Sequence, residues 1–274
     1  MKKNSNNEKN INSSLNKAMC IIRCLATAPK EGMRILDIAN ANNFTASSVH
    51  RLLGNLIEEN FVEQIIGTKR YRLSLDFFLL AASAVHGDNL LQIAHPALLR
   101  LSAMLNDTVF LMVRHKFDAI CLDRIDGSFP IRSFTSEIGG RVPLGIGQGS
   151  LAILAFLPEE EQEAIIQFNM PRILDRTNMD EIDMRKAINL VYEKGFAFFN
   201  FQLISGMAGL AVPILNNNNY PVAALSVGTL IDRLSDERSV IMKDLLQKEA
   251  TLIGKRVNPF DNTLRNPMQS LRLN

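Results

Sequence analysis

Residues 45–58 combine a continuous apolar stripe with an opposite face that is polar throughout. The apolar positions follow the i, i+3, i+4, i+7, i+8 spacing of a helix that packs by one side, and they are Val49, Leu52, Leu53, Leu56 and Ile57. Thr45 suits the N-cap, because its hydroxyl oxygen can accept a hydrogen bond from an amide of the first turn. The opposite face carries Ser47, Ser48, His50, Arg51, Asn55 and Glu58.

Two helices precede this stretch and a hairpin follows it. Apolar residues recur at helical spacing over 15–26, and residues 34–43 predict a short second helix that ends near an Asn pair. After the amphipathic helix, two extended runs flank residues 67–69, and the second run alternates apolar residues with Arg70 and Arg72. Three helices followed by a hairpin with a basic tip predict a winged helix-turn-helix over residues 14–75.

A domain of this kind binds DNA through its third helix and its hairpin. Residues 14–75 hold eight Lys or Arg and five Asp or Glu, so eight minus five leaves +3, against +2 for the whole chain. This local excess suits phosphate binding. The alternative is a helical interaction domain that does not bind DNA and whose polar face is only exposed to solvent. The candidate DNA-binding residues are Thr45, Ser47, Ser48, His50, Arg51, Asn55, Thr68, Lys69 and Arg70.

The rest of the chain alternates strands and helices. Strands come in hairpins that helices interrupt, which favours an α+β domain with an antiparallel sheet over a doubly wound parallel one. We expect a disordered tail over 1–13, a linker and dimerisation helix over 76–93, an effector domain over 94–257 and a tail over 258–274. Within these regions we expect breaks near Gly87 and Pro96, strands at 108–113, 119–125, 129–136 and 196–201, a turn at 216–219, and helices starting at Pro158, over 181–194 and over 235–256.

Gly145, Gly147 and Gly149 precede an apolar run at 151–156. They do not form a P-loop, because no Lys follows them, and their spacing is not that of the dinucleotide fingerprint. Ser150 lacks the second glycine of a G-x-S-x-G nucleophile elbow. Two interpretations stay open: a helix N-terminus that receives a carboxylate through free N–H groups, or a tight turn needed only to pack the helix.

Composition excludes several other classes. Three cysteines, an odd number, argue against a disulfide framework, and no Cys or His pair completes a zinc site. The longest apolar run, 77–85, is far shorter than the ~18 residues of a membrane span. No secretory signal opens the chain. We therefore expect a cytoplasmic protein without metal or cofactor. No nucleophile, base and orienting group can be assembled, so we expect no enzyme.

The segment FTASSVHRLLGNLIEENFVEQIIGTKRYRLS resembles the DNA-binding part of the IclR family of bacterial transcription regulators. GGRVPLGIGQGSLAILAFLPEEE, YEKGFAFFNF, GMAGLAVPI and PVAALSVGTLIDRLS resemble the effector domain of that family, in order along the chain. The resemblance implies a GAF-like effector domain and a homodimer or homotetramer on a palindromic operator. The alternative is a metabolite-binding protein or enzyme whose N-terminal module contacts protein rather than DNA.

The same resemblance implies an effector pocket bordered by the glycine loop, by residues 199–209 and by the strand at 222–228. The chain departs from the family at two points: a Cys often found near Met207 is absent, and acidic residues common near 199–202 are replaced. A small aromatic or aliphatic acid is the effector class that this implies. The candidate effector-binding residues are Gly147, Gln148, Gly149, Ser150, Asn200, Gln202, Ser205, Met207 and Ser226.

Overall fold

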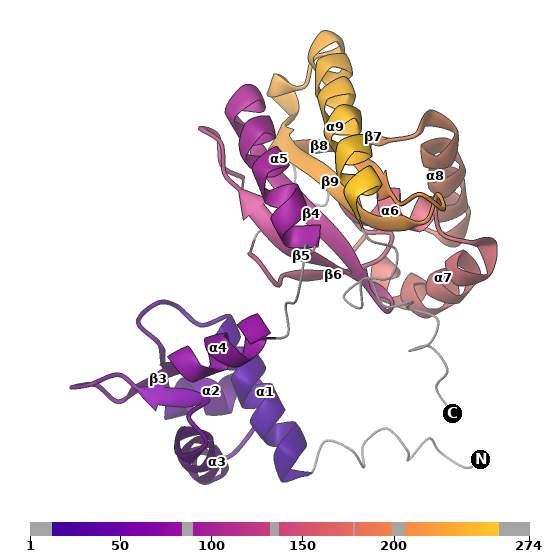
Figure 1. Ribbon diagram of the computed structural model, residues 1–274. Coiled ribbons are helices and arrows are strands. Elements are labelled where there is room, and N and C mark those ends of the chain that lie inside the picture. Colours follow the sequence, from indigo (N-terminus) through magenta and orange to yellow (C-terminus); the bar gives the residue numbers. More distant parts are fainter. Residues whose placement is uncertain (1–12, 84–89, 132–136, 178, 199–205, 258–274) are drawn as a thin grey trace, which may run out of the picture. The chain divides into compact units, whose positions relative to one another are not determined.

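The computed structural model describes residues 13–83, 90–131, 137–177, 179–198 and 206–257 (Figure 1). The chain divides into two compact units, an N-terminal unit, Met1–His86, and a C-terminal unit, Gly87–Asn274. The linker helix expected over 76–93 runs across this division. Its middle, and nearly all of the two expected tails, lie outside the described residues, so these domain boundaries stay predictions.

The N-terminal unit contains the expected helices and hairpin together with one strand that the sequence pattern did not indicate. That strand, β1, pairs with β3, so that the unit carries a three-stranded sheet in the order β1-β3-β2. The elements are α1 (Ser14–Ala26), β1 (Met33–Arg34), α2 (Ile35–Asn42), α3 (Ala46–Glu58), β2 (Val62–Gln64), β3 (Arg70–Leu73) and α4 (Leu75–Ser83).

Helices α1, α2 and α3 of this unit enclose one apolar core. Ile21 of α1, Ile38 of α2, and Val49 and Leu53 of α3 are buried together. Of the predicted stripe on α3, only Ile57 stays partly exposed, and the rest is buried. The opposite face of α3 is therefore left to solvent or to a partner.

The C-terminal unit is built on an antiparallel six-stranded sheet in the order β6-β5-β4-β9-β8-β7. The expected hairpin is present, with its turn after Leu215 and before Pro221. The elements are α5 (Leu90–Leu105), β4 (Thr108–His115), β5 (Asp118–Ile125), β6 (Arg141–Pro143), α6 (Gln148–Ala155), α7 (Glu159–Leu174), α8 (Glu181–Lys194), β7 (Ala197–Phe198), β8 (Met207–Leu215), β9 (Pro221–Leu230), the short 3-10 helix η1 (Ile231–Arg233) and α9 (Asp236–Arg256).

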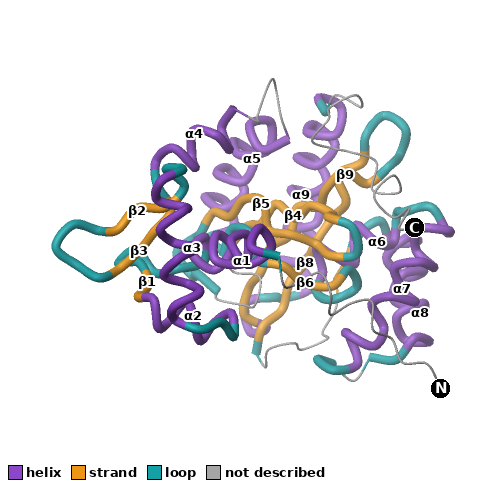
Figure 2. The backbone as a smooth tube through the Cα atoms, turned by 90° about the horizontal axis from the view of Figure 1, so that it is seen from below, coloured by secondary structure: helices purple, strands orange, loops and turns teal. Residues whose placement is uncertain are grey.

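Helices cover both faces of this sheet (Figures 1 and 2). Successive residues of a strand point to opposite faces. Leu111 of β4 thus packs with α5 and α9, whereas Phe110 and Met112 pack with α6, α7 and α8. Two apolar layers result, one on each side of the sheet. Among the described residues, no helix is long and apolar enough to cross a membrane.

Two local predictions were wrong. Pro96 does not break a helix but lies inside α5, which loses only the one hydrogen bond that the missing N–H would have made. The strand expected over 129–136 is not formed in its described part, since Phe129 makes only an isolated bridge to Asp107. Residues 132–136 lie outside the described residues. The strand that pairs with β5 is instead β6.

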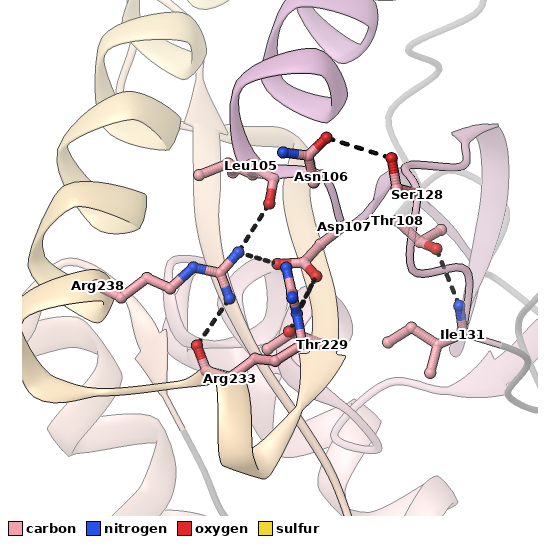
Figure 3. Close-up of polar contacts among 9 residues, drawn as sticks. All are labelled: Leu105, Asn106, Asp107, Thr108, Ser128, Ile131, Thr229, Arg233 and Arg238. Atoms are coloured by element: carbon pink, nitrogen blue, oxygen red, sulfur yellow. Dashed lines mark hydrogen bonds and ion pairs between the residues drawn. The ribbon is translucent and has the colours of Figure 1, made fainter.

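A buried carboxylate joins three elements at one end of the sheet (Figure 3). Asp107, fully buried between α5 and β4, accepts hydrogen bonds from Thr229 of β9 at 3.1 Å and from Arg233 of η1 at 3.2 Å. Arg238, in the first turn of α9, donates to the same carboxylate and to the carbonyl of Leu105. Burying this charge is tolerable because each carboxylate oxygen has a donor.

Candidate DNA-binding face and effector site

The exposed face of α3 carries most of the residues that the sequence singled out. Thr45 is the N-cap as expected, with its Oγ1 accepting from the Ser48 amide at 3.3 Å. Ser47 is exposed, its Oγ lies 3.3 Å from Thr45 Oγ1, and Ser48 is half-buried. These three residues belong to the start of α3, where the free amides and the helix dipole favour a phosphate.

Further along α3, His50, Arg51 and Asn55 are exposed on one side of the helix. The described residues offer no hydrogen bond or ion pair to any of these three side chains. The chain carries no Asp or Glu between Asp37 and Glu58, so nothing acidic on α3 itself lies beside Arg51. A polar helix face with an exposed arginine can contact phosphates and the edges of bases in the major groove.

The candidate residues of the hairpin, Thr68, Lys69 and Arg70, differ in whether their side chains make hydrogen bonds within the unit. The Thr68 hydroxyl donates to the Ile65 carbonyl at 2.9 Å and accepts from the Arg70 amide at 3.2 Å. The Arg70 guanidinium donates to the Gly32 carbonyl at 2.8 Å. Lys69 is exposed and has no side-chain partner among the described residues. Thr68 and Arg70 therefore help to shape the hairpin, and only Lys69 has its whole side chain available to DNA.

In the C-terminal unit, the three glycines of the loop before α6 have different surroundings. Gly145 has φ +108°, and a Cβ there would lie 2.6 Å from Met184 Cε. A Cβ on Gly149 would lie 2.8 Å from Met112 Cγ. Gly147, the N-cap of α6, also has a positive φ, +81°, but a Cβ on it would meet open space. Packing thus requires Gly145 and Gly149, and only Gly147 faces outward.

Buried side chains hold this loop in place. The Ser150 hydroxyl accepts from the Gly145 amide at 3.1 Å and donates to the Ile146 carbonyl at 2.7 Å. Asn169 of α7, fully buried, donates to the Leu144 carbonyl at 3.0 Å. The Ser150 side chain is thus committed to the loop, and a ligand at this residue would meet its backbone N–H. The sequence pattern did not indicate Asn169, which lies in an unrelated helix.

The start of α6 packs on the strands β8 and β9. A Cβ on Gly149 would lie 3.2 Å from Ser226 Cβ, and one on Gly209 would lie 3.2 Å from Gln148 Oε1. Ser226 is largely buried as a residue, and its hydroxyl has no hydrogen-bond partner among the described residues. A hydroxyl without a protein partner is a natural contact for a ligand or a water molecule.

Met207, another candidate effector residue, does not lie at this point. Met207 pairs with Leu230, whereas Ser226 pairs with Ala211. Met207 and Ser226 are therefore four residues apart along the strand pair, about 13 Å at the rise of a β-strand. Asn200, Gln202 and Ser205 lie outside the described residues. The structure thus brings together Gln148, Gly149 and Ser226, with Gly147 and Ser150 beside them.

Two family models match the chain. The IclR helix-turn-helix domain matches residues 14–65, and the model described as bacterial transcriptional regulator IclR C-terminal matches residues 82–255. The chain belongs to the IclR family of bacterial transcriptional regulators. The family confirms the expected α+β fold, with an N-terminal helix-turn-helix domain and a C-terminal domain built on an antiparallel sheet.

Named IclR relatives are regulators rather than enzymes. The HTH-type transcriptional regulator KipR of Bacillus subtilis is 25% identical over 90% of this chain and 98% of its own length. The transcriptional repressor IclR of Escherichia coli is 24% identical over 82% of each chain. The protein is therefore a DNA-binding transcription regulator with a C-terminal ligand-binding domain, and the enzyme alternative is not supported.

Solved structures of the family share the fold. An IclR homologue of Microbacterium hydrocarbonoxydans in complex with 4-hydroxybenzoate is 20% identical, with a TM-score of 0.74 over 88% of this chain and 98% of that one. The Thermotoga maritima IclR structure is 24% identical, with a TM-score of 0.68 over 88% and 97%. At these identities the match establishes the arrangement of elements and not the ligand.

Proposed function

We propose that this IclR-family chain acts in the cytoplasm as a dimer or tetramer that binds a palindromic operator. The exposed face of α3, with Arg51 free of any partner in the described part of the chain, supports this proposal most directly. Two copies related by a two-fold axis present two such helices, and the half-sites then form a palindrome. On each half-site, Ser47 and Ser48 contact phosphate, while His50, Arg51 and Asn55 reach base edges.

Selection of duplexes from random-sequence DNA tests operator binding with the full-length protein. The expected outcome is enrichment of sequences with inverted half-sites and an affinity that falls steeply with salt, since phosphate contacts release counterions. Binding of equal strength to every random duplex would contradict a specific operator. Enrichment of a single half-site without inversion would contradict the two-fold arrangement.

We propose that the effector is a small organic acid bound at the start of α6. The Gly147 position is open, the first turn of α6 offers amide N–H groups, and the Ser226 hydroxyl lies beside Gly149 without a partner among the described residues. A carboxylate fits these donors because the N-terminus of a helix carries partial positive charge. The relative in complex with 4-hydroxybenzoate binds an aromatic acid, which lends support to this class of ligand.

A thermal-shift panel tests the effector class. Benzoates and short aliphatic acids are compared with the corresponding amides, which keep the shape of each compound and lose its charge. A ligand that binds only the folded state raises the melting temperature with concentration. Stabilisation by acids and not by their amides is the expected result, and equal responses to both series would argue against a carboxylate site.

A further inference from the structure

The tip of the wing displays an isoleucine almost completely to solvent. Ile66 is 99% exposed, and the next most exposed large apolar side chain in the described part of the chain, Leu15, is 70% exposed. Its neighbour Ile65 is half-buried, and the Cδ1 atom of Ile65 lies 3.0 Å from the place of a Cβ on Gly32. Ile66 therefore buries almost no apolar surface within the chain, and that surface can be removed from water by contact with a partner.

The turn that carries Ile66 is held firmly. The Thr68 amide donates to the Ile65 carbonyl at 3.0 Å, and the Gln64 side chain donates to the Thr68 carbonyl at 2.7 Å. Gly67 has φ +76°, which suits the third position of a tight turn. Because the turn is already ordered, Ile66 can be pressed against a partner without the entropic cost of fixing a loose loop.

The surroundings of Ile66 are basic. No acidic residue occurs from Gln64 to Leu75, and Glu63 is engaged with Arg72 at 2.6 Å. Lys69 is free of partners in the described part of the chain, and Arg70 keeps its charge while bonded to the Gly32 carbonyl. A protein partner usually needs a contiguous apolar patch, which a single exposed isoleucine close to Lys69 and Arg70 does not supply. A duplex groove, lined with phosphates outside and sugar and base edges inside, matches both features.

We infer that Ile66 is a DNA-contacting residue that enters the minor groove beside the α3 half-site and packs against deoxyribose and base edges. The inference rests on the proposed operator binding and adds a residue that the sequence motifs did not mark. It also assigns different parts to the wing: Ile66 and Lys69 contact DNA, whereas Thr68 and Arg70 hold the tip in shape.

The test compares variants of the full-length protein on a duplex selected from random DNA, with affinity measured across a salt series. Ile66→Ala is expected to weaken binding about tenfold at every salt concentration, because it removes apolar contact and no charge. Lys69→Ala is expected to weaken binding and to reduce the salt slope by about one. Ile66→Met, which keeps an apolar side chain of similar volume, is expected to restore most of the affinity.

The matched control is Ile182→Ala, the same deletion at a position of α8 that is 63% exposed in the other unit. It should bind as the wild type does. Equal affinity of Ile66→Ala and Ile182→Ala would overturn the inference, and so would a drop in the salt slope for Ile66→Ala. Failure of the wild type to bind any selected duplex would instead refute the proposed operator binding. Unfolding curves of Ile66→Ala should match the wild type, since the side chain is fully exposed.

Discussion

Asp107 and Arg238 form an ion pair, 2.6 Å between Oδ2 and Nη2, across 131 positions of the sequence. Asp107 leads from α5 into β4, and Arg238 lies in the first turn of α9, so the pair ties α9 to the start of β4, one of the two central strands of the sheet. Arg233 adds a second cation to the same carboxylate and lies 3.8 Å over the ring of Phe129. This cluster therefore holds η1, α9 and the segment after β5 together.

Replacing the carboxylate should cost much of the stability of the C-terminal unit. Asp107→Asn leaves two part-buried guanidinium groups without their charge partner, and we expect a loss on the order of 2–4 kcal/mol in the free energy of unfolding, allowing for the part-exposure of both arginines. Urea denaturation measures the change. Asp244→Asn removes an exposed carboxylate, which pairs only with Lys243 in the described part of the chain, and should change stability little.

Removing the Arg51 side chain should weaken specific DNA binding. Arg51→Ala is expected to cost about 1–3 kcal/mol on the selected duplex and less on random duplex, because a contact to a base edge contributes only to the specific complex. Titration at constant salt measures both affinities. Arg176→Ala, at an exposed position of the C-terminal unit, is the charge-matched control. Unchanged operator affinity for Arg51→Ala would show that α3 is not the recognition helix.

Replacing two glycines inside helices by alanine should change the stability of the protein in opposite directions. A Cβ on Gly254 of α9 would lie 2.0 Å from the Leu215 carbonyl oxygen of β8, so Gly254→Ala must push the helix off the sheet at a cost of about 1–3 kcal/mol. A Cβ on Gly54 of α3 meets nothing within 4 Å, so Gly54→Ala should stabilise the N-terminal unit by about 0.5–1 kcal/mol. Thermal unfolding of the two variants measures the difference in sign.

The thiol of Cys121 should make the protein sensitive to alkali. Burial raises the pKa of this thiol from 9.0 to about 12. The folded state then keeps a proton that the unfolded state releases, so the stabilising contribution is complete below pH 9 and is lost as pH rises from 9 towards 12. Urea unfolding at pH 8 and pH 10 should show a smaller loss for Cys121→Ala than for the wild type. An equal loss in both proteins would assign the alkaline effect to other groups.

Gln148 should affect effector response and leave basal DNA binding intact. Gln148 is the first residue of α6, and its side chain lies against Gly209 of β8, beside the site proposed for the acid. Gln148→Ala is expected to reduce stabilisation by the best acid of the thermal-shift panel, while operator affinity without ligand stays at the wild-type value. Gln167→Ala, on an exposed position of α7, is the control. A full ligand response in Gln148→Ala would move the effector site away from this helix start.

Most of the helices and the exposed face of α3 followed from the sequence, because both depend on local periodicity, whereas the short strands β1 and β6 did not. The stripe at Val49, Leu52, Leu53 and Leu56 could bury itself in only one way, and the residues opposite it were then left outside. Helix ends were equally local: Thr45 and Ser235 cap α3 and α9 with their own side chains. The prediction at Pro96 was wrong because apolar packing on both sides of it keeps α5 helical.

Contacts between distant segments were decided by the tertiary structure alone. The sequence around Asp107 does not predict its contacts with Arg233 and Arg238, and the sequence around Gly149 does not predict its contacts with Met112 and Ser226. The glycine loop 145–149 looked like one motif, yet its members meet three different environments: Gly145 packs on Met184 of α8, Gly149 packs on Met112 of β4, and Gly147 faces open space. Sequence periodicity determines which side of an element is buried, whereas the partner that buries it depends on how the whole sheet is ordered.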